Sequence, residues 1–191
     1  AIEGTESDWQ DSADYDIGDD IPYKLTATLA NNVTEYTAYH ITFHDTMDKS
    51  LDFNNTSVSV KIGNDDAVAV SLGEKTVGNV KYTLTEGTDK HSFDLRLDWG
   101  DGTTNITDDN LKNAVVTVEF TAKLNSRAIL GNKGNVNAAY LGFSNNPNSN
   151  STDYTQKDAV IAFTYKVDIS KVDEQGRSLK GAAFKLEKEK K

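Results

Sequence analysis

Apolar and polar residues alternate with a period of two along much of the chain, as in YKLTATL at residues 23–29. This alternation is typical of β-strands that turn one face toward a core. It predicts strands at residues 23–29, 39–43, 58–62, 67–72, 80–85, 93–97, 115–124, 136–143 and 159–168. Clusters of Gly, Asn and Asp separate these segments, and short helical turns are expected only near 108–113 and 126–130. The pattern therefore predicts an all-β protein, an antiparallel Ig-like β-sandwich.

The two ends of the chain follow different patterns. The first twenty residues are acidic and aperiodic, so they predict a leading loop that ends at a turn near Gly18. After the strand at 159–168 the pattern restarts as a strand, a polar turn and a second strand. We expect one β-domain over residues 1–165 and an incomplete second β-domain hairpin over residues 166–191. The chain has no signal-peptide pattern, which suggests a mature or trimmed polypeptide.

Charge and composition exclude several classes of partner. The 191 residues carry a formal net charge of -10, which disfavours nucleic acid and anionic membranes because both are bound through Lys and Arg. No stretch is apolar enough to cross a bilayer, so no membrane insertion is expected of this segment. The chain has no cysteine. An extracellular β-protein without disulfides needs either a sufficient core or another kind of cross-link.

Enzymatic and metal-binding interpretations have little support in the sequence. The three histidines are scattered, and neither a cysteine nor a G-x-S-x-G motif is present. His40 and His44 share a strand face but lie roughly 13 Å apart along it. An Asp-rich loop lacks the EF-hand ligand pattern; its carboxylates are Asp98, Asp101, Asp108 and Asp109. We therefore expect no enzyme, no metal and no cofactor.

Two groups of motifs resemble known families. The segments DIGDDIPYKLTATL (16–29), ITFHDTMDKSLDF (41–53) and NVNAAYLGFSNNPN (135–148) together resemble the central domain of Gram-positive, sortase-assembled backbone pilins. The segment KVDISKVDEQGRSLKGAAFKL (166–186) is similar to the first hairpin of a Cna B-type domain. The resemblance implies a structural subunit of a cell-surface pilus. Its location would be the extracellular cell wall, and its partners would be neighbouring pilin subunits joined covalently by sortase.

The resemblance also implies a self-catalysed cross-link inside each domain. In such families a lysine amine attacks an asparagine amide, ammonia leaves, and a buried acid assists. The matching residues in the first domain are the amide of Asn137 and the acid Asp45, with Glu119 as the reserve acid. The family's lysine corresponds to a position at or immediately before Ala1, so in this chain it either precedes Ala1 or is missing, and Lys24 is a poorer candidate because its position faces solvent. In the second hairpin the match places the nucleophile at Lys171.

The chemistry of such a site explains the residue types that it uses. A protonated lysine has no lone pair, so an apolar surrounding that lowers its pKa makes it a nucleophile. Burial instead raises the pKa of a carboxyl group, so the group stays protonated and can hydrogen-bond the amide carbonyl. The reaction occurs once per site, without turnover.

A surface adhesin is the alternative function. Exposed aromatic rings could form a stacking surface for a host extracellular matrix protein or a glycan. The candidate rings are Trp9, Trp99, Tyr15, Tyr36 and Tyr154. The same residues could instead pack in the core or at a domain junction, and the sequence leaves both interpretations open.

Overall fold

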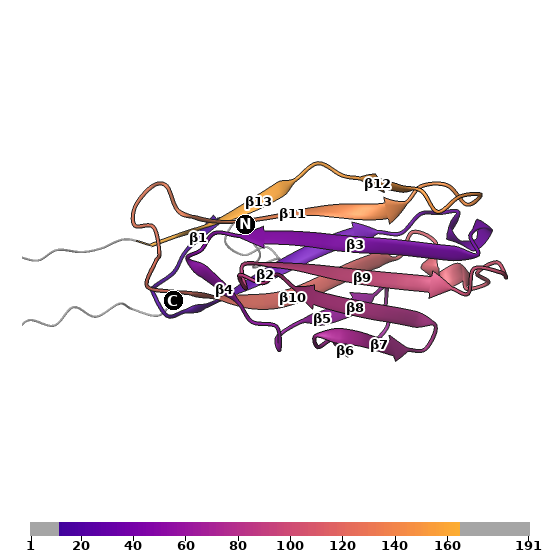
Figure 1. The fold of residues 1–191 in the computed structure, drawn as a ribbon, viewed down its shortest axis with the longest axis horizontal. Coiled ribbons are helices and arrows are strands. Elements are labelled where there is room, and N and C mark those ends of the chain that lie inside the picture. Colours follow the sequence, from indigo (N-terminus) through magenta and orange to yellow (C-terminus); the bar gives the residue numbers. More distant parts are fainter. Residues whose placement is uncertain (1–11, 165–191) are drawn as a thin grey trace, which may run out of the picture.

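The computed structural model describes residues 12–164, which form two β-sheets packed face to face (Figure 1). The eight-stranded sheet has the order β1-β13-β11-β3-β9-β8-β7, and β12 pairs with β11 outside this path. Its strands are β1 (Ser12–Asp14), β3 (Ala38–Met47), β7 (Gly73–Val77), β8 (Val80–Glu86), β9 (Ser92–Gly100), β11 (Asn135–Ser144), β12 (Thr152–Tyr154) and β13 (Asp158–Phe163). All its pairings are antiparallel except that of β1 with β13.

The second sheet has five strands in the order β2-β10-β5-β6, with β4 also paired to β10. Its strands are β2 (Asp20–Thr28), β4 (Leu51–Phe53), β5 (Ser59–Ile62), β6 (Val68–Ala69) and β10 (Val115–Leu124). Two 3₁₀ turns, η1 (Val33–Glu35) and η2 (Asp109–Leu111), lie in the connections. The predicted all-β, Ig-like sandwich is confirmed.

The core lies between the two sheets because the inward-facing positions of their central strands are apolar. In β9 the buried residues are Phe93, Leu95, Leu97 and Trp99, and they alternate with more exposed polar residues. Phe93 stacks on Phe53 with 4.4 Å between ring centroids and meets Phe120 edge to face at 4.9 Å. These contacts join the two sheets, since Phe93 belongs to the larger sheet and the other two rings to the smaller one.

Several short strands depart from the sequence-based expectations. The strand predicted at 67–72 is reduced to Val68–Ala69, and no helical turn forms at 126–130, whereas η2 lies within the turn expected at 108–113. Strands β1, β4, β7 and β12 were not predicted. Strand β7 has no buried residue, so it carries no hydrophobic period for a sequence to reveal. The predicted domain boundary at 165 and the hairpin at 166–191 lie outside the described residues.

Gly100 ends β9 in a conformation that favours glycine, with a φ of +85°. A Cβ at this position would also collide with the backbone carbonyl oxygen of Thr37. We expect Gly100→Ala to lower the free energy of unfolding by about 1–3 kcal/mol, because strain and collision act together. Gly102 is the matched control: its φ is +80°, but a Cβ there would meet nothing within 4 Å. If urea denaturation shows that the two alanine variants lose the same free energy of unfolding, the collision with Thr37 does not contribute to the cost.

Candidate functional site: a buried acid and amide

Asp45 and Asn137 are brought together by the pairing of β3 with β11. In this register Ala139 lies opposite Asp45, and Asn137 lies opposite Met47. Asp45 and Asn137 are therefore diagonal neighbours whose side chains point to the same face of the sheet. That face is the inner one, because the exposed fractions of the two residues are only 2% and 4%. The acid and the amide selected from the sequence are thus adjacent and buried.

A hydrogen bond joins the two side chains directly. The Asn137 amide Nδ2 donates to the Asp45 carboxyl Oδ2 at 3.0 Å. The resemblance had implied that the acid contacts the amide carbonyl, but Asp45 contacts the amide nitrogen. This is the nitrogen that would leave as ammonia if the Asn137 amide were attacked.

Burial keeps Asp45 protonated over a wide pH range. Loss of solvent raises the pKa of its carboxyl from 3.8 to about 7, and the hydrogen bond from Asn137 opposes this rise. Tyr23, on β2 of the opposite sheet, also has a shifted pKa. Burial raises the pKa of the Tyr23 hydroxyl, and the Asp45 carboxyl raises it further. Tyr23 is therefore close enough to Asp45 for their charges to interact, across the space between the sheets.

Three polar atoms of this group lack hydrogen-bond partners within residues 12–164. They are Oδ1 of Asp45, Oδ1 of Asn137 and the hydroxyl oxygen of Tyr23. An unsatisfied buried polar atom costs about 1–3 kcal/mol, so three such atoms in one core are unfavourable for a purely structural cluster. The site can accept hydrogen bonds from a further donor, as an amine would supply.

The neighbouring Asn135 shows what a purely structural buried amide looks like in this fold. Its Nδ2 donates to the carbonyl oxygens of Ile129 and Ala162, and its Oδ1 accepts from the backbone N–H of Ile129. Asn135 is fully buried and its side chain ties a loop to β13. Asn137 differs because, within residues 12–164, its side-chain amide makes only the hydrogen bond with Asp45. This contrast distinguishes the two asparagines of the NVN motif, which sequence alone cannot do.

Tyr23 is a member of the site that the sequence analysis did not select. Its alternating strand correctly places it inward, with an exposed fraction of 3%. The available signal was a tyrosine at a core position, whose hydroxyl needs a partner once it is buried. Phe120 stacks on the Tyr23 ring at 5.3 Å between centroids, so the orientation of the phenol is fixed by packing.

Glu119 is not part of this group, which corrects its selection as the reserve acid. It is exposed on β10 of the smaller sheet, opposite Lys24 of β2 and Ser59 of β5. Its strand alternates so that Val118 and Phe120 face the core, which turns Glu119 to the outer surface. Lys171 and any lysine at or before Ala1 lie outside the described residues, so their roles stay predictions.

The other polar groups selected from the sequence have local partners. Asp101 accepts from the backbone N–H groups of Thr103 and Thr104, which lowers the pKa of its carboxyl to about 2. His44 Nδ1 lies 2.7 Å from Asp94, and His40 bonds Ser144 and Thr152. In the described part of the chain, no three metal-binding side chains cluster, and no helix is long and apolar enough to cross a membrane.

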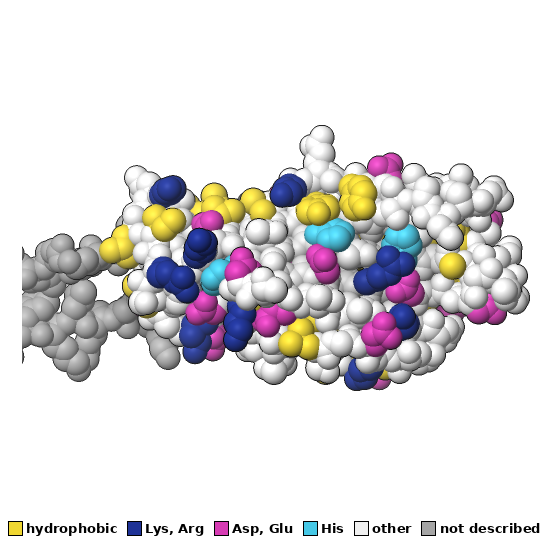
Figure 2. Space-filling model, viewed as in Figure 1, with side chains coloured by type: hydrophobic (Ala, Val, Ile, Leu, Met, Phe, Trp, Pro, Cys, Tyr) yellow, Lys and Arg dark blue, Asp and Glu magenta, His cyan; other side chains and the backbone are white. Residues whose placement is uncertain are grey.

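The aromatic residues proposed for an exposed stacking surface are largely in the core. Trp99 and Tyr36 have exposed fractions of 2% and 3%, so of the two interpretations left open the packing one holds for them. Tyr15 packs against the core, Tyr154 is 58% exposed, and Trp9 lies outside the described residues. On the face shown in Figure 2, hydrophobic side chains form small separate groups among charges of both signs.

Comparisons with known proteins find one curated relative and several solved structures with a similar fold. The chain is 26% identical over 183 residues to the trypsin-resistant surface T6 protein of Streptococcus pyogenes serotype M6, covering 88% of this chain and 32% of that protein. It thus spans about a third of the length of this curated relative. No protein-family model matches the chain.

Two solved pilin structures have folds similar to that of this chain. The T6 backbone pilin of Streptococcus pyogenes matches with a TM-score of 0.56 and 24% identity, over 77% of this chain and 31% of that one. A C-terminal fragment of the major pilin GBS80 of Streptococcus agalactiae matches with a TM-score of 0.61 and 20% identity, over 88% and 57%. The described part of the chain has the Ig-like fold of a Gram-positive backbone-pilin domain, and the resemblance to backbone pilins that the motifs within residues 16–148 indicated is confirmed.

Proposed function

We propose that this chain is part of a structural subunit of a Gram-positive surface pilus, located outside the cell in the wall-attached filament. Neighbouring pilin subunits, joined covalently by sortase, are its expected partners. The single observation that carries the proposal is the buried Asp45–Asn137 pair, because the pilin motifs lead to these two residues and the fold brings them together. The similarity to the T6 surface protein supports the same assignment.

The pair supports a self-catalysed Lys–Asn isopeptide bond within the domain. An uncharged lysine amine, supplied from a position at or before Ala1, attacks the carbonyl carbon of the Asn137 side chain. A new C–N bond forms, the bond from that carbon to Nδ2 breaks, and Nδ2 leaves as ammonia after taking one proton from the attacking amine. No oxidant, metal or cofactor takes part, so atoms and charge balance within the three groups.

Asp45 is placed to assist the departure of the amide nitrogen. Its carboxyl already contacts Nδ2 at 3.0 Å, and its pKa of about 7 lets it both release and accept a proton near neutrality. It can therefore carry a proton from the attacking amine to the leaving nitrogen. The apolar surroundings that hold Asp45 protonated would also favour the uncharged form of an incoming amine.

A cross-link of this kind suits a filament that bears load. A bond between the first strand segment and β11 would close a long loop and limit the freedom of the unfolded chain, as a disulfide does. The chain has no cysteine, so it has no disulfide of its own to serve this purpose. The role is structural, and the chemistry occurs once in the life of each molecule.

Assembly into pili can be tested in the organism that encodes the protein. Antibodies raised against residues 12–164 should label surface filaments and detect a ladder of high-mass species in cell-wall extracts boiled in SDS. Deleting the sortase gene should collapse this ladder to the monomer, because the links between subunits are covalent. A single monomeric band in the parent strain would overturn the assignment to a pilus.

A further inference from the structure

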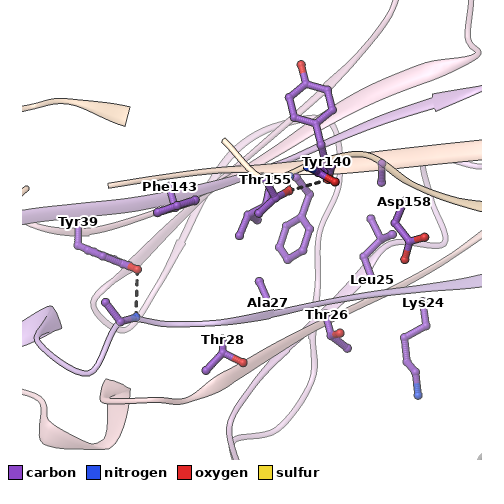
Figure 3. A pocket seen from close by; sticks show the side chains of 15 residues that line it. Lys24, Leu25, Thr26, Ala27, Thr28, Tyr39, Tyr140, Phe143, Thr155 and Asp158 are labelled. Carbon is purple, nitrogen blue, oxygen red and sulfur yellow. Dashed lines mark hydrogen bonds between the residues drawn. The ribbon is translucent and has the colours of Figure 1, made fainter. Parts of the chain in front are cut away.

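Strand β2 lies across the core from β3 and β11 of the larger sheet. One groove of about 570 Å³ is lined by Leu25 of β2, Phe43 of β3 and Ala139 of β11 (Figure 3). Ala30 and Tyr39 line the same groove, and the backbone N–H of Ala30 donates to the Tyr39 hydroxyl at 3.2 Å, a contact that Figure 3 draws as a dashed line. Strand β2 traced backward from Ala30 therefore runs in the same direction as β3 traced forward from Tyr39.

The next inward-facing positions along these strands bring three polar side chains to one place. Inward-facing residues are two positions apart in a strand. Beyond the residues that line the groove, on the side away from Tyr39, each strand carries a buried polar residue at this next position, and the three are Tyr23, Asp45 and Asn137. Tyr23 thus lies across the space between the sheets from the acid and the amide.

The packing of aromatic rings supports the same alignment. Phe120 of β10 meets Phe93 of β9 edge to face, so β10 lies across from β9. In the registers of the two sheets, Tyr23 is the neighbour of Phe120, and Asp45 is the neighbour of Phe93. One strand further along both sheets, on the side of the groove, Tyr23 again lies across from Asp45.

Tyr23 and Asn137 have complementary hydrogen-bonding groups that the folded protein leaves unused. Within residues 12–164 the Tyr23 hydroxyl has no acceptor, and Oδ1 of Asn137 has no donor. Asp45 does not supply that donor, because its carboxyl contacts Nδ2 of the same amide. Burial raises the pKa of the Tyr23 hydroxyl, so this group keeps its proton near neutral pH and is available as a donor.

We propose that the Tyr23 hydroxyl donates a hydrogen bond to Oδ1 of Asn137 when the lysine amine attacks, a role that rests on the proposed function. As the new C–N bond forms, an electron pair of the C=O bond moves onto Oδ1. Tyr23 stabilises this negative charge and keeps its own proton. The pair returns to the C=O bond as the bond to Nδ2 breaks. Because the hydrogen bond is not formed before the attack, it stabilises the transition state selectively.

The rate of the ammonia loss that depends on Asn137 tests this role. Tyr23→Phe removes the hydroxyl and keeps the ring that stacks on Phe120. Cell-free synthesis of a polypeptide that includes the proposed lysine, followed by intact-mass spectrometry at successive times, gives the rate. We expect Tyr23→Phe to react on the order of 100-fold more slowly than the parent, as when one oxyanion donor is removed. Tyr82→Phe, which removes the hydroxyl of a buried tyrosine on β8, should react at the parent rate.

Two outcomes of this experiment separate the role of Tyr23 from the cross-link itself. Equal rates for the parent and Tyr23→Phe would overturn the role of Tyr23 and leave the cross-link standing. A parent that loses no ammonia at Asn137 would overturn the proposed function, and the role of Tyr23 with it.

The stability of residues 1–191 distinguishes this role from a structural one. The hydroxyl has no partner in the fold, so Tyr23→Phe should leave the free energy of unfolding in urea unchanged or raise it. A variant that is both slower and less stable would show that the hydroxyl supports the fold, and would overturn the proposal. If the hydroxyl instead donated to the Asp45 carboxylate, its removal would raise the folded-state pKa of Asp45, and the fall in stability would extend to higher pH. That result would overturn the proposal as well.

Discussion

Replacing Asp45 by Asn is expected to stabilise the fold at neutral and alkaline pH and to leave it almost unchanged in acid. The folded-state pKa of Asp45, about 7, lies above the ordinary value of 3.8. The folded protein therefore binds an extra proton between these values, and its stability falls as pH rises through that window. A difference from 3.8 to about 7 corresponds to on the order of 4 kcal/mol, fully lost above about pH 8.

Asparagine isolates the ionisation because it has nearly the same shape and keeps an oxygen that can accept from Asn137. Urea denaturation at a series of pH values, applied to residues 1–191, would show a falling free energy of unfolding for the parent and a flatter profile for Asp45→Asn. Asp101→Asn is the control, since the pKa of Asp101 is lowered to about 2 and its effect is confined to acid. Parallel profiles for the parent and Asp45→Asn between pH 4 and 7 would show that burial does not hold this carboxyl protonated.

If the proposed lysine precedes Ala1, replacing Asn137 by Ala should weaken a polypeptide that includes this lysine by much more than it weakens residues 1–191. The covalent bond is expected to contribute about 2–5 kcal/mol, by analogy with a disulfide that closes a long loop. In residues 1–191 the same change removes only the contact with Asp45 and leaves that carboxyl without its donor. Guanidinium denaturation of the long and short chains, each as the parent and as Asn137→Ala, separates the stabilisation by the covalent bond from that by the hydrogen bond to Asp45. If Asn137→Ala lowers the free energy of unfolding equally in the long and short chains, no bond forms at Asn137.

The sequence predicted the long strands well because they carry a complete hydrophobic period. The predicted strand at 115–124 coincides with β10, whose inward positions run from Val116 to Leu124 without interruption. The short edge strands could not be predicted in this way. β12 has only three residues, and two of them are exposed, so its pairing with β11 depends on tertiary position and not on its own composition.

The candidate site was predictable in its residues but not in its geometry. Motif resemblance selected Asp45 and Asn137, and the strand register then explains why they meet. The same resemblance cannot indicate which amide atom the acid contacts, because that depends on side-chain orientation. Glu119 failed as a candidate because its strand turns it outward, and Tyr23 was missed because it reaches the site from the opposite sheet.

The proposed cross-link requires Asn137 to be the acceptor of the covalent bond. Intact-mass spectrometry of the full-length natural protein and of its Asn137→Ala variant tests this directly. The parent should be lighter than its unmodified sequence by one ammonia for every bond formed, and the variant should show one such loss fewer. A parent protein at its unmodified mass, or a variant with the same number of losses as the parent, would contradict the account.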